Sequence, residues 1–164
     1  MKIQVSGISE GVHHYDLKTD ARTLDLGERF PGEVRVAVNL ERVGTQVHLR
    51  AQASTRGVFE CDRCLAPFES LLKASYTMHY LTEGDHGGFD PAEVQIVPSH
   101  LGVIDLAEDV RQTVLLAVPL KLLCRPDCAG LCPRCARNLN EGPCGCVDEA
   151  TDARWEGLRR LGSS

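Results

Sequence analysis

The sequence predicts an α+β protein: an antiparallel β-sheet with a packed helix, followed by a C-terminal Cys-rich zinc-binding module. The first half contains segments in which apolar and polar residues alternate, as in half-buried strands. One segment with helical spacing of apolar residues follows them. Six of the eight cysteines then lie between Cys124 and Cys146. We therefore expect a core of sheet and helix over residues 1–123 and a zinc module over residues 124–164.

The composition supports a folded core and a cytoplasmic location. Of the 164 residues 43% are hydrophobic but only 5% are aromatic, so aliphatic side chains must fill the core. No stretch approaches the roughly 20 apolar residues of a membrane span, and the first residues lack an apolar run of signal-peptide length. We expect a cytoplasmic protein with no membrane contact, in which clustered cysteines bind metal and do not form disulfides.

The first residues predict a strand, because Ile3 and Val5 alternate with polar residues over residues 1–9. Residues 11–27 are mixed in composition and rich in turn-forming residues. The adjacent His13 and His14 would point to opposite sides of a strand, and we interpret both as surface histidines.

A hairpin is the best-marked part of the predicted sheet. Residues 33–40 alternate apolar and polar side chains, and residues 47–53 repeat the pattern after the turn Val43-Gly44-Thr45. Such alternation is typical of antiparallel strands with one solvent-exposed face.

Gly57 begins the next predicted piece, which leads into the turn Cys61-Asp62-Arg63-Cys64 and a return strand over residues 68–81. Two residues between the cysteines let both sulfurs face one metal ion at about 2.3 Å. A redox dithiol is the alternative, but that interpretation requires a βαβ context. A glycine-rich acidic loop and a short strand at residues 93–97 follow.

A helix is predicted after this strand, with Asp105 as its cap, Glu108 completing a capping box and Pro119 ending it. A second helix is expected over residues 151–161, with Trp155 on its packing side. The apolar residues of the first helix have helical spacing: Leu106, Val110, Val114, Leu115 and Val118.

The sequence contains no recognisable catalytic motif. GxGxxG, GxxxxGK[ST], HExxH and GxSxG are all absent from it, and no pair of carboxylates stands out as an acid and base. We therefore predict a protein that is not an enzyme, with no catalytic residues and no small-molecule substrate.

Eight cysteines suffice for two tetrahedral zinc sites with four thiolates each. The last four close a loop of only 15 residues, so little entropy opposes their assembly. The remaining four would join the sheet to the segment after the helix. The first predicted site consists of Cys61, Cys64, Cys124 and Cys128. The second consists of Cys132, Cys135, Cys144 and Cys146.

Two alternatives to this assignment stay open. The two CxxC pairs could share one metal, with Cys61 and Cys64 beside Cys132 and Cys135. The CxxxCxxC spacing that starts at Cys128 is also that of radical-SAM enzymes, which bind a [4Fe–4S] cluster. Those enzymes need a much larger barrel than this chain provides, and zinc fits an all-thiolate set better.

Charge is unevenly distributed along the chain. The formal net charge of −5 argues against a surface coated with basic residues, yet residues 111–140 contain five basic residues and one acid, Asp127. These cations either offset thiolate charge or contact RNA. The candidates for contact with RNA or a protein partner are Arg63, Lys121, Arg125, Arg134 and Arg137.

Several segments resemble the YceD family of large-ribosomal-RNA-subunit accumulation proteins. They are CDRCLAPFE, DLAEDVRQTVLLAVPLKLLC, CAGLCPRCARNLN, CGC and ARWEGLRRL, between Phe59 and Leu161. Cys61 and Cys64 match the family's CxRC turn, and Cys124 and Cys128 match its second pair. The last four cysteines match a set that some members lack.

The resemblance implies a role in accumulation of large-subunit (23S) ribosomal RNA and in assembly of the large subunit. The implied partner is that RNA or a pre-ribosomal particle. A basic large-subunit ribosomal protein is a further implied partner, because the acidic faces of the chain would attract it. Three other interpretations remain: a redox-sensing zinc protein, an enzyme acting on RNA, and a zinc-ribbon module that only binds protein.

One residue departs from the family pattern. The position after the second cysteine of the CPxC turn is usually glycine in the family, and here it is Ala136. Alanine in a left-handed backbone conformation costs about 1 kcal/mol, so we expect mild strain in the second site.

Overall fold

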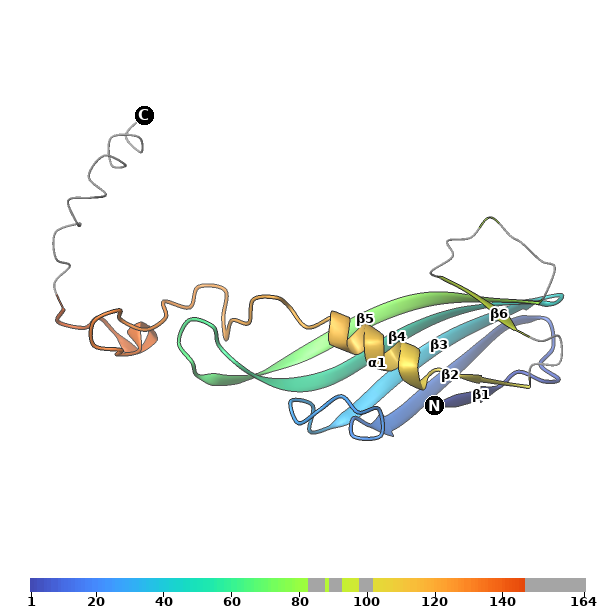
Figure 1. The fold of residues 1–164 in the computed structure, drawn as a ribbon, viewed down its shortest axis with the longest axis horizontal. Helices are drawn as coiled ribbons and strands as arrows, with labels where there is room; N and C mark the ends of the chain where they lie inside the picture. Colours follow the sequence, from blue (N-terminus) through green and yellow to red (C-terminus); the bar gives the residue numbers. More distant parts are fainter. Residues whose placement is uncertain (83–87, 89–92, 98–101, 147–164) are drawn as a thin grey trace, which may run out of the picture.

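The structure, a computed structural model, describes residues 1–82, 88, 93–97 and 102–146. Its main sheet has five strands in the order β2-β3-β4-β5-β6 (Figure 1). Neighbouring strands are antiparallel except for β6, which runs parallel to β5. The sheet is therefore mixed, where the sequence predicted an antiparallel one. The strands are β2 (Gly11–Asp20), β3 (Glu33–Val43), β4 (Gln46–Glu60), β5 (Pro67–Thr82) and β6 (Val94–Val97).

The first predicted strand exists but belongs to a separate small sheet. Strand β1 (Lys2–Gln4) pairs antiparallel with β7 (Val103–Asp105). The terminal ammonium group of Met1 lies 3.0 Å from Oδ1 of Asp105 and extends the contact between the two strands.

Strand β2 occupies part of the segment that looked turn-rich. It pairs with β3 along its full length, from Gly11 to Asp20. As an edge strand it needs only one weakly apolar face, here Tyr15 and Leu17, which pack on the core. That weak alternation is the reason the sequence pattern did not predict the strand.

The predicted hairpin is confirmed and is longer than expected. The even-numbered residues of β3 from Val34 to Leu40 are buried, and Gly44 takes a positive φ of 59° in the turn. Gly57, however, lies inside β4 and does not begin a new strand. A Cβ at this position would lie 2.5 Å from the Phe59 ring and 3.2 Å from the Phe30 ring, so the glycine makes room for both rings.

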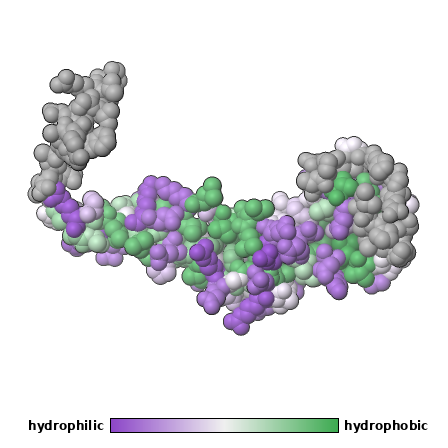
Figure 2. Space-filling view, in the orientation of Figure 1, coloured by the Kyte–Doolittle hydropathy of each residue, from purple (hydrophilic) through white to green (hydrophobic). Residues whose placement is uncertain are grey.

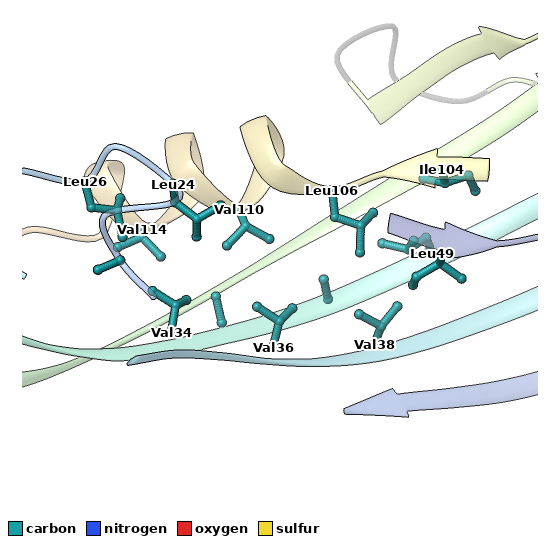
Figure 3. Packing of buried hydrophobic residues seen from close by; sticks show 14 of the residues in the cluster. Leu24, Leu26, Val34, Val36, Val38, Leu49, Ile104, Leu106, Val110 and Val114 are labelled. Carbon is teal, nitrogen blue, oxygen red and sulfur yellow. The ribbon is translucent and has the colours of Figure 1, made fainter. Parts of the chain in front are cut away.

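The predicted first helix is α1 (Ala107–Leu116), whose Val110 and Val114 are buried in the same core as the sheet (Figure 3). It ends before Val118, and Leu116 is 85% exposed. Figure 2 shows hydrophobic surface in the middle of this view, near α1. No helix in the described part of the chain is long and apolar enough to cross a membrane.

The predicted capping box does not form. The N-cap residue is Leu106, and Oδ1 of Asp105 accepts a hydrogen bond from the Ala107 N–H at 3.0 Å. Oε1 of Glu108 accepts hydrogen bonds from Arg111 and Gln112 in the next turn of the helix. The second predicted helix, over residues 151–161, lies outside the described residues.

After α1 the chain returns to the connection between β4 and β5 (Figure 1). Asp62 fixes this return: its N–H donates to the carbonyl of Leu122 at 2.8 Å, and its Oδ2 accepts from the Leu122 N–H at 2.6 Å. This two-way contact delivers Cys124 to the turn that carries Cys61 and Cys64. A short 3₁₀ helix, η2 (Leu139–Glu141), follows in the cysteine-rich segment.

Candidate metal centres

The first group of cysteines joins two distant parts of the chain. Its four sulfur atoms all lie within 4.8 Å of one another. Cys61 Sγ lies 3.7 Å from Cys128 Sγ, and Cys64 Sγ lies 3.7 Å from Cys124 Sγ. Tetrahedral coordination with Zn–S bonds of about 2.3 Å separates sulfurs by about 3.8 Å, so the group fits such an ion.

A tight backbone turn positions the first two sulfurs. The Leu65 N–H donates to the Cys61 carbonyl at 2.9 Å, and the Cys61 N–H donates to the Ala66 carbonyl at 3.0 Å. To close this turn Leu65 adopts a φ of 57°, in the left-handed region. The chain thus reverses within six residues and turns both sulfurs to one side.

The second group repeats the turn with different residues. The Ala136 N–H donates to the Cys132 carbonyl at 2.9 Å, and the Cys132 N–H donates to the Arg137 carbonyl at 2.8 Å. Ala136 has a φ of 55°. The left-handed conformation expected at Ala136 is therefore present, and Leu65 has the same conformation in the first group.

The two groups differ in solvent exposure. The sulfurs of the second group also lie within 4.8 Å of one another, so it too could hold a metal ion. In the first group Cys124 is partly exposed and the other three cysteines are buried. In the second group Cys135 and Cys146 are exposed and only Cys132 is buried. The second group is the more accessible to solvent.

Within each group the backbone favours ionisation of one thiol. Burial opposes ionisation of Cys61, but backbone N–H groups, that of Cys124 first, donate to its sulfur and lower its pKa to about 6. The N–H groups of Cys135 and Arg134 lower the pKa of Cys132 to about 6 in the same way. A thiolate is thus favoured at one position in each group near neutral pH.

Other thiols in the same groups resist ionisation. Burial and the neighbouring sulfurs raise the pKa of Cys124 to about 12. The adjacent Cys135 sulfur and burial raise the pKa of Cys146 to about 12. A divalent ion would offset the repulsion among four thiolates, so its binding would release protons.

Asn140 links the two groups. Its Nδ2 donates to Cys128 Sγ at 3.3 Å and lowers the pKa of that thiol. Its Oδ1 accepts from the Arg125 guanidinium at 2.6 Å and from the Ala129 N–H at 2.8 Å. Asn140 lies in η2, between the cysteines of the second group, yet it holds a cysteine of the first. No spacing rule in the sequence singles this residue out.

The guanidinium groups of Arg63 and Arg125, two of the predicted RNA-contact residues, make structural hydrogen bonds. Arg63 donates to the carbonyl of Cys128 at 2.7 Å, and Arg125 donates to Asn140 and lies 3.6 Å from Asp127. The other three are exposed on or beside the loops that carry the cysteines: Lys121, Arg134 and Arg137.

Both cysteine groups fall within one match to a known family. Residues 49–162 match the family model described as "Large ribosomal RNA subunit accumulation protein YceD". The chain belongs to the YceD family. This confirms the resemblance found in the sequence and extends the matched region towards the N-terminus from Phe59 to residue 49.

Relatives of this YceD-family chain occur in bacteria and plants. An uncharacterized protein of Mycobacterium tuberculosis is 30% identical over 135 residues, which are 82% of this chain and 63% of that protein. A Mycobacterium leprae protein is 25% identical over 127 residues, covering 76% of this chain and 57% of the relative. The chain thus spans less than two thirds of the length of these relatives.

A plant relative carries a functional name. The Arabidopsis thaliana protein "Large ribosomal RNA subunit accumulation protein YCED homolog 1, chloroplastic" is 31% identical over 64 residues. These are 39% of this chain and 20% of that protein. No solved structure matches the chain.

Proposed function

We propose that this YceD-family protein is a non-enzymatic factor that promotes accumulation of 23S ribosomal RNA and assembly of the large ribosomal subunit. The observation that carries the proposal is the family match over residues 49–162, which includes both cysteine groups. The name of the plant relative supports the same role.

We propose zinc as the metal, in a structural role at both groups. Four thiolates fill a tetrahedral coordination sphere and leave no position for a reactive water molecule. Soft thiolate ligands suit zinc, and magnesium and calcium prefer oxygen ligands. The first ion would lie between Cys61, Cys64, Cys124 and Cys128. The second would lie between Cys132, Cys135, Cys144 and Cys146.

In this proposal the first zinc ion attaches a module of residues 124–164 to a core of residues 1–123, with Cys61 and Cys64 as the ligands from the core. The partner is large-subunit ribosomal RNA or a pre-ribosomal particle, and a basic large-subunit ribosomal protein is the alternative. Lys121, Arg134 and Arg137 are exposed on or beside the cysteine loops and form one candidate contact surface for this partner. A reducing compartment such as the cytoplasm suits two sets of metal-binding thiols.

The experiment that tests the role is complementation of a strain that lacks the protein. The ratio of 23S to 16S ribosomal RNA is measured with the parent chain, with Cys61→Ser and with no protein. We expect the parent to restore the ratio and Cys61→Ser to fail, because the first zinc site is lost. An unchanged 23S level in the strain without the protein would contradict the proposal.

A redox-sensing role is the second candidate, and the exposure of Cys135 and Cys146 favours it. Accessible thiolates are the ones that oxidants reach first. If this role holds, peroxide releases zinc from the second group reversibly and changes the 23S level. Zinc release without an effect on 23S RNA would leave the structural role as the better explanation.

A further inference from the structure

A row of cations crosses the face of the main sheet that lies opposite α1. The pairing register places Lys18 beside Arg35, Arg35 beside Ser54 and Ser54 beside Lys73. All three cationic residues are exposed. Strands lie about 4.8 Å apart, so this row spans roughly 14 Å from β2 to β5.

The row borders a shallow cavity of about 680 Å³ on the same face. The adjacent row is built from small or polar residues, since Ala37 pairs with Gln52 and Gln52 pairs with Ser75. Arg50 lies on this face one row further along the sheet, beside Asn39 and Thr77. We define the central patch as Lys18, Arg35, Arg50 and Lys73.

The central patch has more positive charge than its surroundings can neutralise. The side chains of Lys18, Arg50 and Lys73 form no hydrogen bond or ion pair with other residues in the described part of the chain, and the Arg35 side chain pairs with Glu33 at 2.8 Å. Asp16 is the one carboxylate among the residues that line the cavity. The chain as a whole carries a formal net charge of −5, so the positive charge of the central patch is opposite in sign to the net charge of the protein.

Acidic residues mark the ends of the central patch along the strands. Asp20 and Glu33 pair with each other one row beyond Lys18, and Glu41 lies one row beyond Arg50 on β3. These carboxylates weaken the attraction of a polyanion to the ends of the face on β2 and β3, and Arg56 on β4, at one of these ends, lies 4.0 Å from Glu69.

The side chains of this face indicate the class of partner. The three rows that contain the central patch include no Phe, Tyr, Trp or large aliphatic residue, and their one imidazole, that of His14, contacts the Asn39 side chain. A stable protein interface needs buried aromatic or aliphatic anchors, and these rows offer none. Base stacking likewise needs aromatic rings. Exposed lysine and arginine above a small polar floor suit phosphate groups.

We propose that the central patch binds the phosphate backbone of RNA, without selection of base sequence. The inference rests on the proposed function, because that function makes ribosomal RNA the partner. The central patch differs in location from the candidate surface of Lys121, Arg134 and Arg137. Its contacts with RNA lie on the sheet and not on the loops of the cysteine groups.

The test compares binding of an in vitro transcript of large-subunit ribosomal RNA by zinc-loaded full-length variants. Lys18→Gln/Arg50→Gln/Lys73→Gln removes three charges from the patch. Lys2→Gln/Arg22→Gln/Arg29→Gln is the matched control, because these exposed cations lie off this face. Lys121→Gln/Arg134→Gln/Arg137→Gln tests the rival surface. Circular dichroism and zinc content confirm that each variant is folded.

We expect the patch variant to bind about 10-fold or more weakly, and the control and the rival variant to bind like the parent. The slope of log Kd against log salt concentration should fall by roughly 2 in the patch variant, because three phosphate contacts are lost. A change only in the rival variant, equal binding by all variants, or no binding by the parent would each overturn the inference. In all three cases the proposed function would stand if the parent still restored 23S RNA in the deletion strain.

Discussion

Nδ2 of Asn140 lies 3.3 Å from Sγ of Cys128, so the loop of the second cysteine group holds a sulfur of the first. The same side chain accepts hydrogen bonds from Arg125 and Ala129, which flank Cys128 on either side. Hydrogen bonds to metal ligands orient them, and their loss commonly lowers metal affinity. The two candidate zinc sites are therefore coupled through one amide.

Replacement of Asn140 should weaken zinc binding at the first site. Asn140→Ala removes the donor to Cys128 and both contacts to its flanking residues, so we expect about 10-fold lower affinity. Competition with a chromophoric chelator measures it in a Cys144→Ser background, where the first site is read alone. Asn39→Ala, on the sheet, is the control. Equal affinity in both variants would show that the hydrogen bond does not couple the sites.

Zinc content tests the two-site assignment directly. Protein purified without added metal should contain two zinc ions per chain, measured by mass spectrometry of the metal. Cys61→Ser and Cys144→Ser should each contain one, because each removes a ligand from a different group. A parent with one zinc that Cys144→Ser retains would restrict metal binding to the first group. If the purified protein contained iron and were brown, the assignment of zinc would be wrong and an Fe–S cluster would take its place.

Backbone strain at the two cysteine turns predicts that glycine substitutions there stabilise the protein. Ala136 and Leu65 both hold a left-handed backbone, with φ values of 55° and 57°. Glycine adopts this conformation without penalty, although it also gains entropy in the unfolded chain. We expect Ala136→Gly and Leu65→Gly each to raise the free energy of unfolding by about 0.5 to 1 kcal/mol in urea titrations of the zinc-loaded protein.

The control for these substitutions is Ala129→Gly, at a residue without positive φ. Here the entropy of the unfolded chain is the dominant change, so the free energy of unfolding should stay level or fall. Destabilisation by Ala136→Gly of the same size as by Ala129→Gly would show that the turn stores no strain.

The sequence was sufficient for the parts of the fold whose pattern is local. The alternation in residues 33–40 and 47–53 predicted the hairpin, because one face of it is buried by aliphatic residues. Loop lengths alone predicted the two groups of cysteines that the structure brings together. The rival arrangement, with both CxxC pairs at one metal, does not occur in the structure.

The features that the sequence did not predict depend on contacts between distant residues. In the sequence Gly57 indicates the end of one strand and the start of another. The Phe30 and Phe59 rings, which come close to it in the structure, explain why a glycine lies inside β4. The parallel direction of β6 depends on the chain path after β5. Asn140 is one of two asparagines in a turn-forming segment, and its role depends on Cys128, which lies 12 positions earlier.

A histidine pair on the sheet predicts how stability depends on pH. His48 on β4 pairs with His79 on β5, and their Nδ1 atoms lie 2.5 Å apart. Burial and the neighbouring His48 lower the pKa of His79, although Glu93 opposes the shift. The unfolded chain therefore takes up a proton at this position at a higher pH than the folded chain does. Stability from His79 is present above about pH 6.5 and is lost as the pH falls through the lower pKa of the folded state.

His79→Gln should accordingly flatten the fall in stability on acidification. Cysteine ligands titrate in the same range in every variant, so the informative quantity is the difference between parent and variant. The free energy of unfolding is measured in urea at pH 7.5 and pH 5.5, with His13→Gln, on β2, as the control. We expect the decrease between the two pH values to be smaller in His79→Gln than in the parent and the control. An equal decrease in all three proteins would show that His79 binds its proton equally well in the folded and unfolded chain.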